Sequence, residues 1–200
     1  METKHMKKTL LVILSLISCF TLAAPGSKAP ERAEGDGPYQ RLILRGGIIV
    51  NGEGAPARGP MDIVIEKDRI VSIVNVGNPG VPIKAKRPVA NKGDIEIDIE
   101  GQYVLPGFID MHGHIGGSAD NIPAEYVFKL WLAHGITTVR EPGSFNGIDW
   151  VMDHVKRSKK NSITAPRIIP YVGFGMGLDD PITTPKQARK WVKSIVKHGA

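Results

Sequence analysis

The spacing of hydrophobic positions changes near the middle of the chain. Between residues 42 and 99, short apolar or alternating runs are separated by Gly-Gly, Gly-Pro, Lys-Asp and Pro-Gly pairs, which is typical of β-strands joined by turns. Because only Lys67 and Asp68 separate two of these runs, we expect a hairpin turn there. The predicted strands of this small β-domain are Leu42–Val50, Asp62–Glu66, Arg69–Val74 and Asp94–Ile99.

After residue 100, strand-like runs alternate with runs of helical periodicity. Such an alternation indicates parallel strands joined by right-handed crossovers, in an α/β fold. The periodicity leaves open whether the sheet is an open doubly wound sheet or a barrel. The predicted elements are strands at Val104–Met111, Thr137–Arg140 and Arg167–Val172 and helices at Ala124–His134, Ile148–Lys159 and Pro185–His198.

The N-terminus has the anatomy of a signal peptide. An apolar run from Leu10 to Ala24 follows Lys7 and Lys8, and it is shorter than the roughly 20 residues that a membrane span needs. We therefore assign residues 1–24 to a signal peptide, with cleavage after Ala23 favoured, and expect the protein to be periplasmic or extracellular. The Leu-Ile-Ser triplet before Cys19 resembles a bacterial lipobox, so a lipid anchor through Cys19 is the alternative.

The remaining boundaries follow from composition. Residues 25–38 are rich in Gly, Pro, Ala and charge, and are predicted to be a disordered tether. We expect the small β-domain to occupy residues 39–105 and the strand–helix units to occupy residues 106–200.

The overall composition excludes several classes of protein. With 42% hydrophobic and 23% charged residues among 200, the chain is able to bury a core. The sequence has no second long apolar run, which excludes a polytopic membrane protein. The net charge of +6 is too mild and dispersed to predict nucleic-acid binding. The single cysteine, Cys19, excludes an intramolecular disulfide and a cysteine-based zinc site. Membrane contact is expected only if Cys19 is lipidated.

Candidate chemistry gathers at the end of the strand predicted at residues 104–111. Asp110, His112 and His114 alternate there, and the period of two directs their side chains to one side. Two histidines one residue apart on extended backbone can both present a ring nitrogen to one metal ion. The alternative is a pair of solvated histidines in a glycine-rich loop. In a parallel α/β fold, sites are built at the carboxyl ends of strands, where this motif lies.

Three stretches resemble the metal-dependent amidohydrolase superfamily. Gly101–His114 resembles the entry to its first barrel strand, and Ala133–Glu141 resembles the second barrel strand of the imidazolonepropionase-like and Xaa-Pro-dipeptidase-like branch. Leu42–Gly47 together with Asp68–Ile73 resembles the small β-sandwich that precedes the barrel in that family. The resemblance covers about residues 40–200.

This resemblance implies a partial (β/α)₈ TIM barrel of about three strand–helix units, preceded by a β-sandwich domain. It also implies one or two divalent metal ions, usually zinc, with His112 and His114 as ligands. The family's other ligands, and the late Asp that passes a proton to the leaving nitrogen, have no counterpart in these 200 residues. We therefore identify no catalytic residue within the chain, interpret it as an N-terminal fragment, and expect the isolated chain to be inactive.

Several other polar residues lie near the predicted strand ends, and the sequence allows alternative roles for three of them. Arg140 and Glu141 either touch substrate, brace the metal ligands or form a structural ion pair; the family more often has Arg-Asp here. Asp110 either orients a ligand histidine or caps the strand end. His134 is expected to lie at a helix end, where it meets the helix dipole, with Gly135 as the C-cap. His154 and His198, remote from the strand ends, receive no chemical role.

The function predicted from the resemblance is hydrolysis of a carbon–nitrogen bond by a metal-activated water, acting on a small non-peptide cyclic amide or amidine. The first alternative is a dipeptidase for Xaa-Pro-like substrates. The second is an exported binding module that keeps the fold without turnover. Metal content separates the two enzymes from the binding module.

Overall fold

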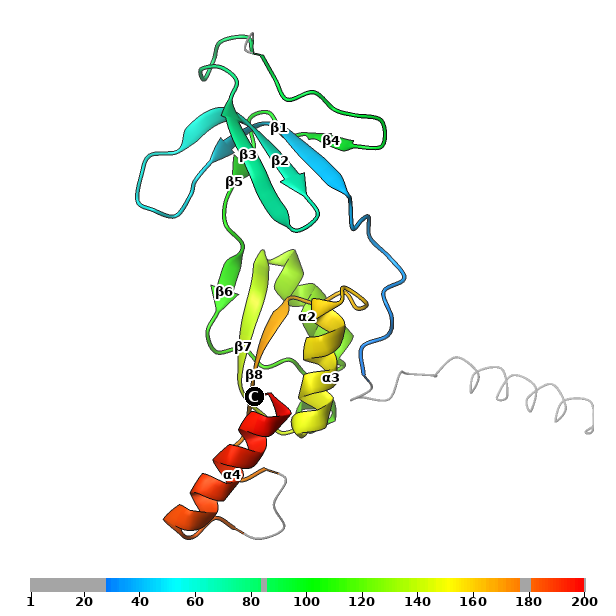
Figure 1. Ribbon diagram of the computed structural model, residues 1–200, viewed down its shortest axis with the longest axis vertical. Coiled ribbons are helices and arrows are strands. Elements are labelled where there is room, and N and C mark those ends of the chain that lie inside the picture. The colour runs from blue at the N-terminus through cyan, green and yellow to red at the C-terminus, as the bar shows by residue number, and fades with distance from the viewer. Residues whose placement is uncertain (1–27, 84–85, 177–180, 200) are drawn as a thin grey trace, which may run out of the picture. The chain divides into compact units, whose positions relative to one another are not determined.

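The computed structural model describes residues 28–83, 86–176 and 181–199 (Figure 1). The chain divides into two compact units, one formed by Ala33–Gly107 and one that combines the segment up to Arg32 with Phe108–Ala200. The predicted signal peptide and Cys19 lie outside the described residues. Among the residues that are described, no helix is both long and apolar enough to cross a bilayer.

The first unit is built on one mixed sheet of five strands. The strands run in the order β3-β2-β1-β4, with β5 also pairing with β1. Neighbours β1, β2 and β3 are antiparallel, whereas β4 and β5 run parallel to β1. The four predicted strands are confirmed. The bounds are β1 Arg41–Ile49, β2 Arg58–Glu66, β3 Arg69–Asn75, β4 Ile95–Asp98 and β5 Tyr103–Val104.

The turn between β2 and β3 is the predicted hairpin. Glu66 pairs with Arg69, so Lys67 and Asp68 alone make the connection. Lys67 has a φ of 54°, in the left-handed region that two-residue hairpin turns require. A lysine therefore adopts the conformation that glycine or asparagine more often supplies.

One face of this sheet holds a buried ionic cluster around Asp62. The Asp62 carboxylate is fully buried and accepts hydrogen bonds from Arg45 Nη1 at 2.8 Å, from Arg87 Nη2 at 2.7 Å and from the Gly46 amide at 3.0 Å. Arg87 lies in the segment before β4, so the cluster fastens that segment to the sheet. Burial alone would raise the pKa of Asp62, but the hydrogen bonds from the two arginines outweigh it and lower the pKa.

The opposite face of the sheet is apolar and partly exposed. Leu44 pairs with both Ile63 and Ile97, and Ile63 pairs with Ile73, which puts these side chains in one row across the sheet. Ile73 is 51% exposed and Ile97 is 41% exposed. The described residues of this unit form one sheet, so the predicted β-sandwich is not confirmed.

The second unit contains the predicted succession of strand–helix units. Its three strands are parallel, in the order β6-β7-β8. This α/β arrangement is consistent with part of a TIM-barrel-like amidohydrolase fold. The elements are β6 Phe108–Asp110, a 3₁₀ turn η1 at Ser118–Asp120, α2 Ala124–Ala133, β7 Ile136–Ser144, α3 Ile148–Lys159, β8 Arg167–Val172 and α4 Pro185–His198.

The single strand expected at Val104–Met111 is instead two strands. Tyr103–Val104 pairs with β1 of the first unit, whereas Phe108–Asp110 pairs with β7 of the second. The chain is interrupted at Pro106, which has no amide hydrogen to donate to a sheet, and Gly107 follows it. The single-strand prediction was therefore wrong, and the interruption is where the two units meet in sequence.

The core of the second unit lies between the sheet and helices α2 and α3, which cover one face of it (Figure 1). Val139 of β7 and Ile168 of β8 pack against Phe128 of α2, and Phe128 and Val139 have no exposed surface. Trp131 and Trp150 pack against this cluster from α2 and α3. Through this cluster, the two helices hold β7 and β8 from one side of the sheet.

Residues 28–32 pack against α3 and are not the disordered tether expected from their composition. The Ala29 side chain is 3% exposed, and its amide donates to Nε2 of His154 at 3.1 Å. The Arg32 amide donates to the Ser162 carbonyl at 2.8 Å. Composition alone does not reveal these contacts, because the partners lie more than a hundred positions further along the chain.

Candidate functional site

The predicted His-Gly-His motif lies directly after β6, at the carboxyl end of the parallel sheet. Asp110 is the last residue of β6 and pairs with Val139, and the Gly113 amide donates to the Arg140 carbonyl at 3.1 Å. The motif therefore continues alongside β7 after the strand ends. This placement brings His112 and His114 to the same sheet edge as Arg140 and Glu141.

Asp110 caps the end of the strand. Its Oδ1 accepts the backbone N–H of His112 at 2.8 Å, which closes a short turn before the histidines. Of the two roles expected for Asp110, the structure thus supports the cap. The carboxylate holds the backbone of His112 rather than a histidine ring.

Gly113 allows the motif to pack closely on α2 and β7. A Cβ atom at this position would lie 3.0 Å from Trp131 Cζ2 and 3.0 Å from Val139 Cγ1, closer than side chains normally approach. Trp131 also donates from its indole Nε1 to the His114 carbonyl at 3.4 Å. Because a side chain at this position would crowd Trp131 and Val139, Gly113 lets the motif lie close against the buried core.

Glu141 holds the second histidine of the motif. Its Oε1 lies 2.9 Å from Nδ1 of His114 and accepts the Gly143 amide at 3.0 Å, while its Oε2 accepts the Ile115 amide at 2.9 Å. The Glu141 side chain is 1% exposed, whereas that of His114 is 50% exposed. An ionised carboxylate can only accept, so Nδ1 of His114 carries the hydrogen, and in the neutral form of the ring Nε2 has the free lone pair.

Arg140 does not pair with Glu141. Its Nη1 donates to the Met111 carbonyl at 3.1 Å, and its guanidinium lies 4.4 Å from the centre of the Tyr171 ring, in a cation–π contact. Tyr171 is 44% exposed, so the pair lies at the surface of the strand ends. The structural ion pair considered for Arg140 and Glu141 is therefore replaced by these contacts.

Tyr171 is the member of this group that sequence reasoning missed. It lies near the carboxyl end of β8, next to the positions that pair with Arg140 and Glu141 of β7. Its place near the end of the third parallel strand was the available signal. The glycine-rich segment after β8 continues from there, and its part beyond Met176 lies outside the described residues.

The histidines of the motif suit a divalent metal in chemistry. Imidazole nitrogen is a preferred ligand of zinc, and the rings of His112 and His114 meet edge to face with centroids 5.8 Å apart. A catalytic zinc takes about three protein ligands. Across residues 28–83, 86–176 and 181–199 no cluster of three or more His, Cys, Asp or Glu could hold a metal. The described residues therefore bring together two candidate ligands, fewer than a catalytic zinc site takes.

The remaining histidines have structural roles in the described chain. His134 lies at the end of α2, as predicted, but it is itself the C-cap, the position expected for Gly135, and its Nδ1 donates to the Leu130 carbonyl at 2.8 Å. His198 makes the same contact with the Ser194 carbonyl at 2.8 Å. His154 is fully buried beside Trp150, and burial lowers its pKa. None of these three joins the strand-end group.

Curated proteins with similar sequences are adenine deaminases. Adenine deaminase 2 of Rhizobium etli is 33% identical over 154 residues, covering 72% of this chain and 23% of that protein. The adenine deaminase of Methanoculleus marisnigri is 37% identical over 94 residues, covering 43% of this chain and 18% of that protein. The chain thus spans about a quarter or less of the length of these relatives. No protein-family model matches it.

Solved structures with a similar fold include prolidases. A prolidase in complex with N-methylphosphonate-L-proline is 21% identical with a TM-score of 0.58, covering 80% of this chain and 45% of that one. A Xaa-Pro dipeptidase with methionine bound in its active site is 21% identical with a TM-score of 0.60, over the same shares. A prolidase-like structure from Bifidobacterium longum is 24% identical with a TM-score of 0.58, covering 80% of this chain and 39% of that one.

Both comparisons relate the chain to the amidohydrolase superfamily. The solved neighbours are members of the amidohydrolase superfamily, and the adenine deaminases belong to the same superfamily. The comparisons therefore confirm the resemblance to the amidohydrolase superfamily that the sequence motifs indicate.

Proposed function

We propose that the protein hydrolyses carbon–nitrogen bonds of a small, non-peptide substrate with the help of one or two divalent metal ions. Zinc is the metal that we expect there. The observation that carries this proposal is the His112-Gly113-His114 motif at a strand end with His114 oriented by the buried Glu141. A ligand histidine whose other ring nitrogen donates to a carboxylate is the usual arrangement in metal sites.

The chain's own residues supply binding and orientation. His112 and His114 would hold the metal through ring nitrogens, and a divalent ion held there supplies Lewis acidity and a nucleophile at neutral pH. Glu141 fixes the ring of His114, and Asp110 fixes the backbone of His112. Proton transfer to the leaving nitrogen is not assigned to any described residue.

For the substrate we propose a cyclic amidine, of which an aminopurine is the leading example. The adenine deaminases are similar to this chain at 31–37% identity in the first three matches, a closer sequence match than the prolidases show. Their name states an action on adenine, in which an exocyclic carbon–nitrogen bond is attacked by water. The substrate would lie over the strand ends beside His112 and His114.

A dipeptidase acting on Xaa-Pro substrates is the second candidate. Arg140 favours it, because its guanidinium stands at the strand ends against Tyr171 and suits a substrate carboxylate. The two candidates differ in product, since one releases ammonia from an amidine and the other releases proline from a dipeptide.

Zinc content and product release test the proposal. In the native protein that contains this chain, elemental analysis is expected to find stoichiometric zinc, and His112→Ala and His114→Ala should each reduce zinc content and abolish turnover. His198→Ala, which changes an exposed histidine on α4, is the matched control and should keep both. Absence of stoichiometric zinc from the unaltered protein would favour the non-catalytic binding module and exclude the enzyme.

Export is a separate proposal that rests on the apolar run at residues 10–24. The mass of the mature N-terminus tests it. An unmodified N-terminus at Ala24 means a cleaved and unanchored protein, whereas a lipid-modified Cys19 means an anchored one. A mature protein that still begins at Met1 or Met6 would contradict export.

A further inference from the structure

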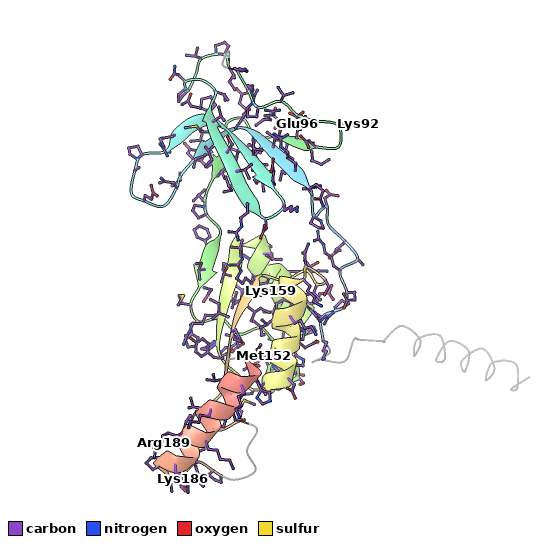
Figure 2. The ribbon with its side chains drawn as sticks, in the orientation of Figure 1. Lys92, Glu96, Met152, Lys159, Lys186 and Arg189 are labelled. Carbon is purple, nitrogen blue, oxygen red and sulfur yellow. The ribbon has the colours of Figure 1, made fainter. Side chains whose placement is uncertain are left out.

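Helix α4 carries five cations on one side and no acidic residue. They recur at helical spacing and, at about 100° per residue, fall within an arc of roughly 100° around the helix axis. All five are exposed, and Figure 2 labels two of them, Lys186 and Arg189. We call this surface the basic face of α4: Lys186, Arg189, Lys190, Lys193 and Lys197.

The basic face accounts for nearly all of the positive charge that the chain has in excess. The sequence has 26 Lys and Arg against 20 Asp and Glu, so without these five residues 21 cations face 20 acids. Within the described part of the chain, no ion pair involves the basic face. The basic face is thus a stripe of positive charge that has no ion-pair partner among the described residues.

The opposite side of α4 is anchored to the rest of its unit. Trp191 is 9% exposed, its indole Nε1 donates to the Met176 carbonyl at 2.9 Å, and its ring meets Phe174 edge to face at 5.1 Å. A capping box between Thr184 and Gln187 fixes the start of the helix. Because Trp191 lies about 140° around the axis from Lys186, the basic face points away from this contact.

We propose that the basic face of α4 docks on the surface of an anionic phospholipid bilayer. The five cations span about 17 Å along a straight helix, which matches a flat surface of negative headgroups. Val192 and Val196 border the basic face on one side and are 48% and 62% exposed, so they can enter the interfacial layer beside the cations. The predicted export would bring the protein to such a surface.

A nucleic acid is the less suitable partner. Proteins that bind single strands combine a basic groove with aromatic side chains on which bases stack. The one aromatic residue of α4, Trp191, is buried on the other side of the helix. The basic face therefore offers charge without an aromatic side chain on which bases stack.

Co-sedimentation with vesicles tests the proposal. The chain is expected to bind vesicles that mix phosphatidylglycerol with phosphatidylcholine, to bind pure phosphatidylcholine weakly, and to be released by salt. Each Lys or Arg near an anionic surface contributes about fivefold to binding. Replacing the whole basic face by Gln should therefore weaken binding by more than about tenfold, whereas Lys→Arg at positions 186, 190, 193 and 197 should preserve it.

A charge-matched variant separates a docking face from general positive charge. This variant replaces five exposed cations elsewhere by Gln, and circular dichroism verifies that both Gln variants are folded. Equal weakening by the two variants, equal binding to neutral vesicles, or tighter binding to a DNA or RNA oligonucleotide than to anionic vesicles would each overturn the proposal. The control positions are Arg58, Lys67, Lys92, Lys156 and Lys160.

Discussion

Nδ1 of His114 lies 2.9 Å from Oε1 of Glu141, although the two residues are 27 positions apart, with His114 after β6 and Glu141 within β7. The parallel pairing of β6 with β7 brings them together, because their carboxyl ends lie at one sheet edge. Glu141 and Val139, two positions apart on β7, are both fully buried. The carboxylate that orients a candidate metal ligand is thus shielded from solvent.

Glu141→Gln is expected to weaken zinc binding by about 10–100-fold, the usual effect of losing a carboxylate that orients a ligand histidine. The Glu141 carboxylate accepts hydrogen bonds from three N–H groups, so the NH₂ group of Gln would face at least one of these donors with a donor of its own. Competition with a zinc chelator, measured on the folded protein, gives the change in affinity without relying on turnover.

Glu125→Gln is the matched control for that variant, because Glu125 is 39% exposed on α2 and pairs only with Lys129 among the described residues. It should leave zinc affinity unchanged. Glu141→Asp, which introduces the residue more frequent in the family, should retain more affinity than Glu141→Gln. Unchanged affinity in Glu141→Gln would mean that His114 is positioned without its carboxylate partner.

Gly113→Ala should destabilise the second unit by about 1–3 kcal/mol, the usual cost of overpacking a core. The added methyl group would meet Trp131 and Val139 at 3.0 Å. Chemical denaturation followed by tryptophan fluorescence measures the change in free energy of unfolding. Gly143→Ala is the control, since its Cβ would lie 3.6 Å from its nearest neighbour; equal losses in both variants would rule out close packing at Gly113 as the cause.

Regular elements of this fold are predictable from sequence because burial imposes their periodicity. The bounds predicted for α3, β8 and α4 match those of the structure. Each of these elements has an apolar stripe or run that faces a core, as Val151, Ile168 and Trp191 do. The spacing of these residues therefore encodes the element directly.

Contacts between distant segments are not encoded in such spacing. The sequence places Arg140 and Glu141 at a strand end but does not reveal that Glu141 binds His114 while Arg140 stacks on Tyr171. It likewise gives no sign that Ala29 is buried against His154. The break at Pro106 was visible in the sequence, yet the apolar residues on both sides favoured a continuous strand.

Asp62→Asn is expected to destabilise the five-stranded sheet by about 3–5 kcal/mol, the usual effect of removing one partner of a buried ion pair. Arg45 and Arg87 would both lose their buried counter-charge. Folding lowers the pKa of Asp62. Its contribution to the free energy of unfolding is therefore complete at pH values above the ordinary aspartate pKa near 3.8, and it is lost as the pH falls below that value. Asp68→Asn, at a side chain 85% exposed, is the control for thermal unfolding.

His154 is predicted to make the packing of residues 28–32 sensitive to pH. Burial lowers its pKa in the folded state, with the charges of Arg157 and Lys28 acting in the same direction and Asp153 and the Trp150 carbonyl opposing them. As the pH falls below the ordinary histidine value of about 6.5, the unfolded chain takes up the proton first, so the folded state loses stability. Protonation would also place a donor opposite the Ala29 amide, which His154 Nε2 accepts at 3.1 Å.

The measurement is the free energy of unfolding at about pH 7.5 and about pH 5.5, on either side of the ordinary histidine pKa. The unaltered chain should be less stable at the lower pH, and the difference should shrink in His154→Gln but persist in His198→Gln, which changes an exposed histidine. Protection of the Ala29 amide against hydrogen exchange, expressed relative to the intrinsic exchange rate at each pH, should decrease at the lower pH as well. If the difference in stability between the two pH values is the same in His154→Gln as in the unaltered chain, groups other than His154 cause it. Asp62 does not contribute to this difference, because its lowered pKa lies below the range.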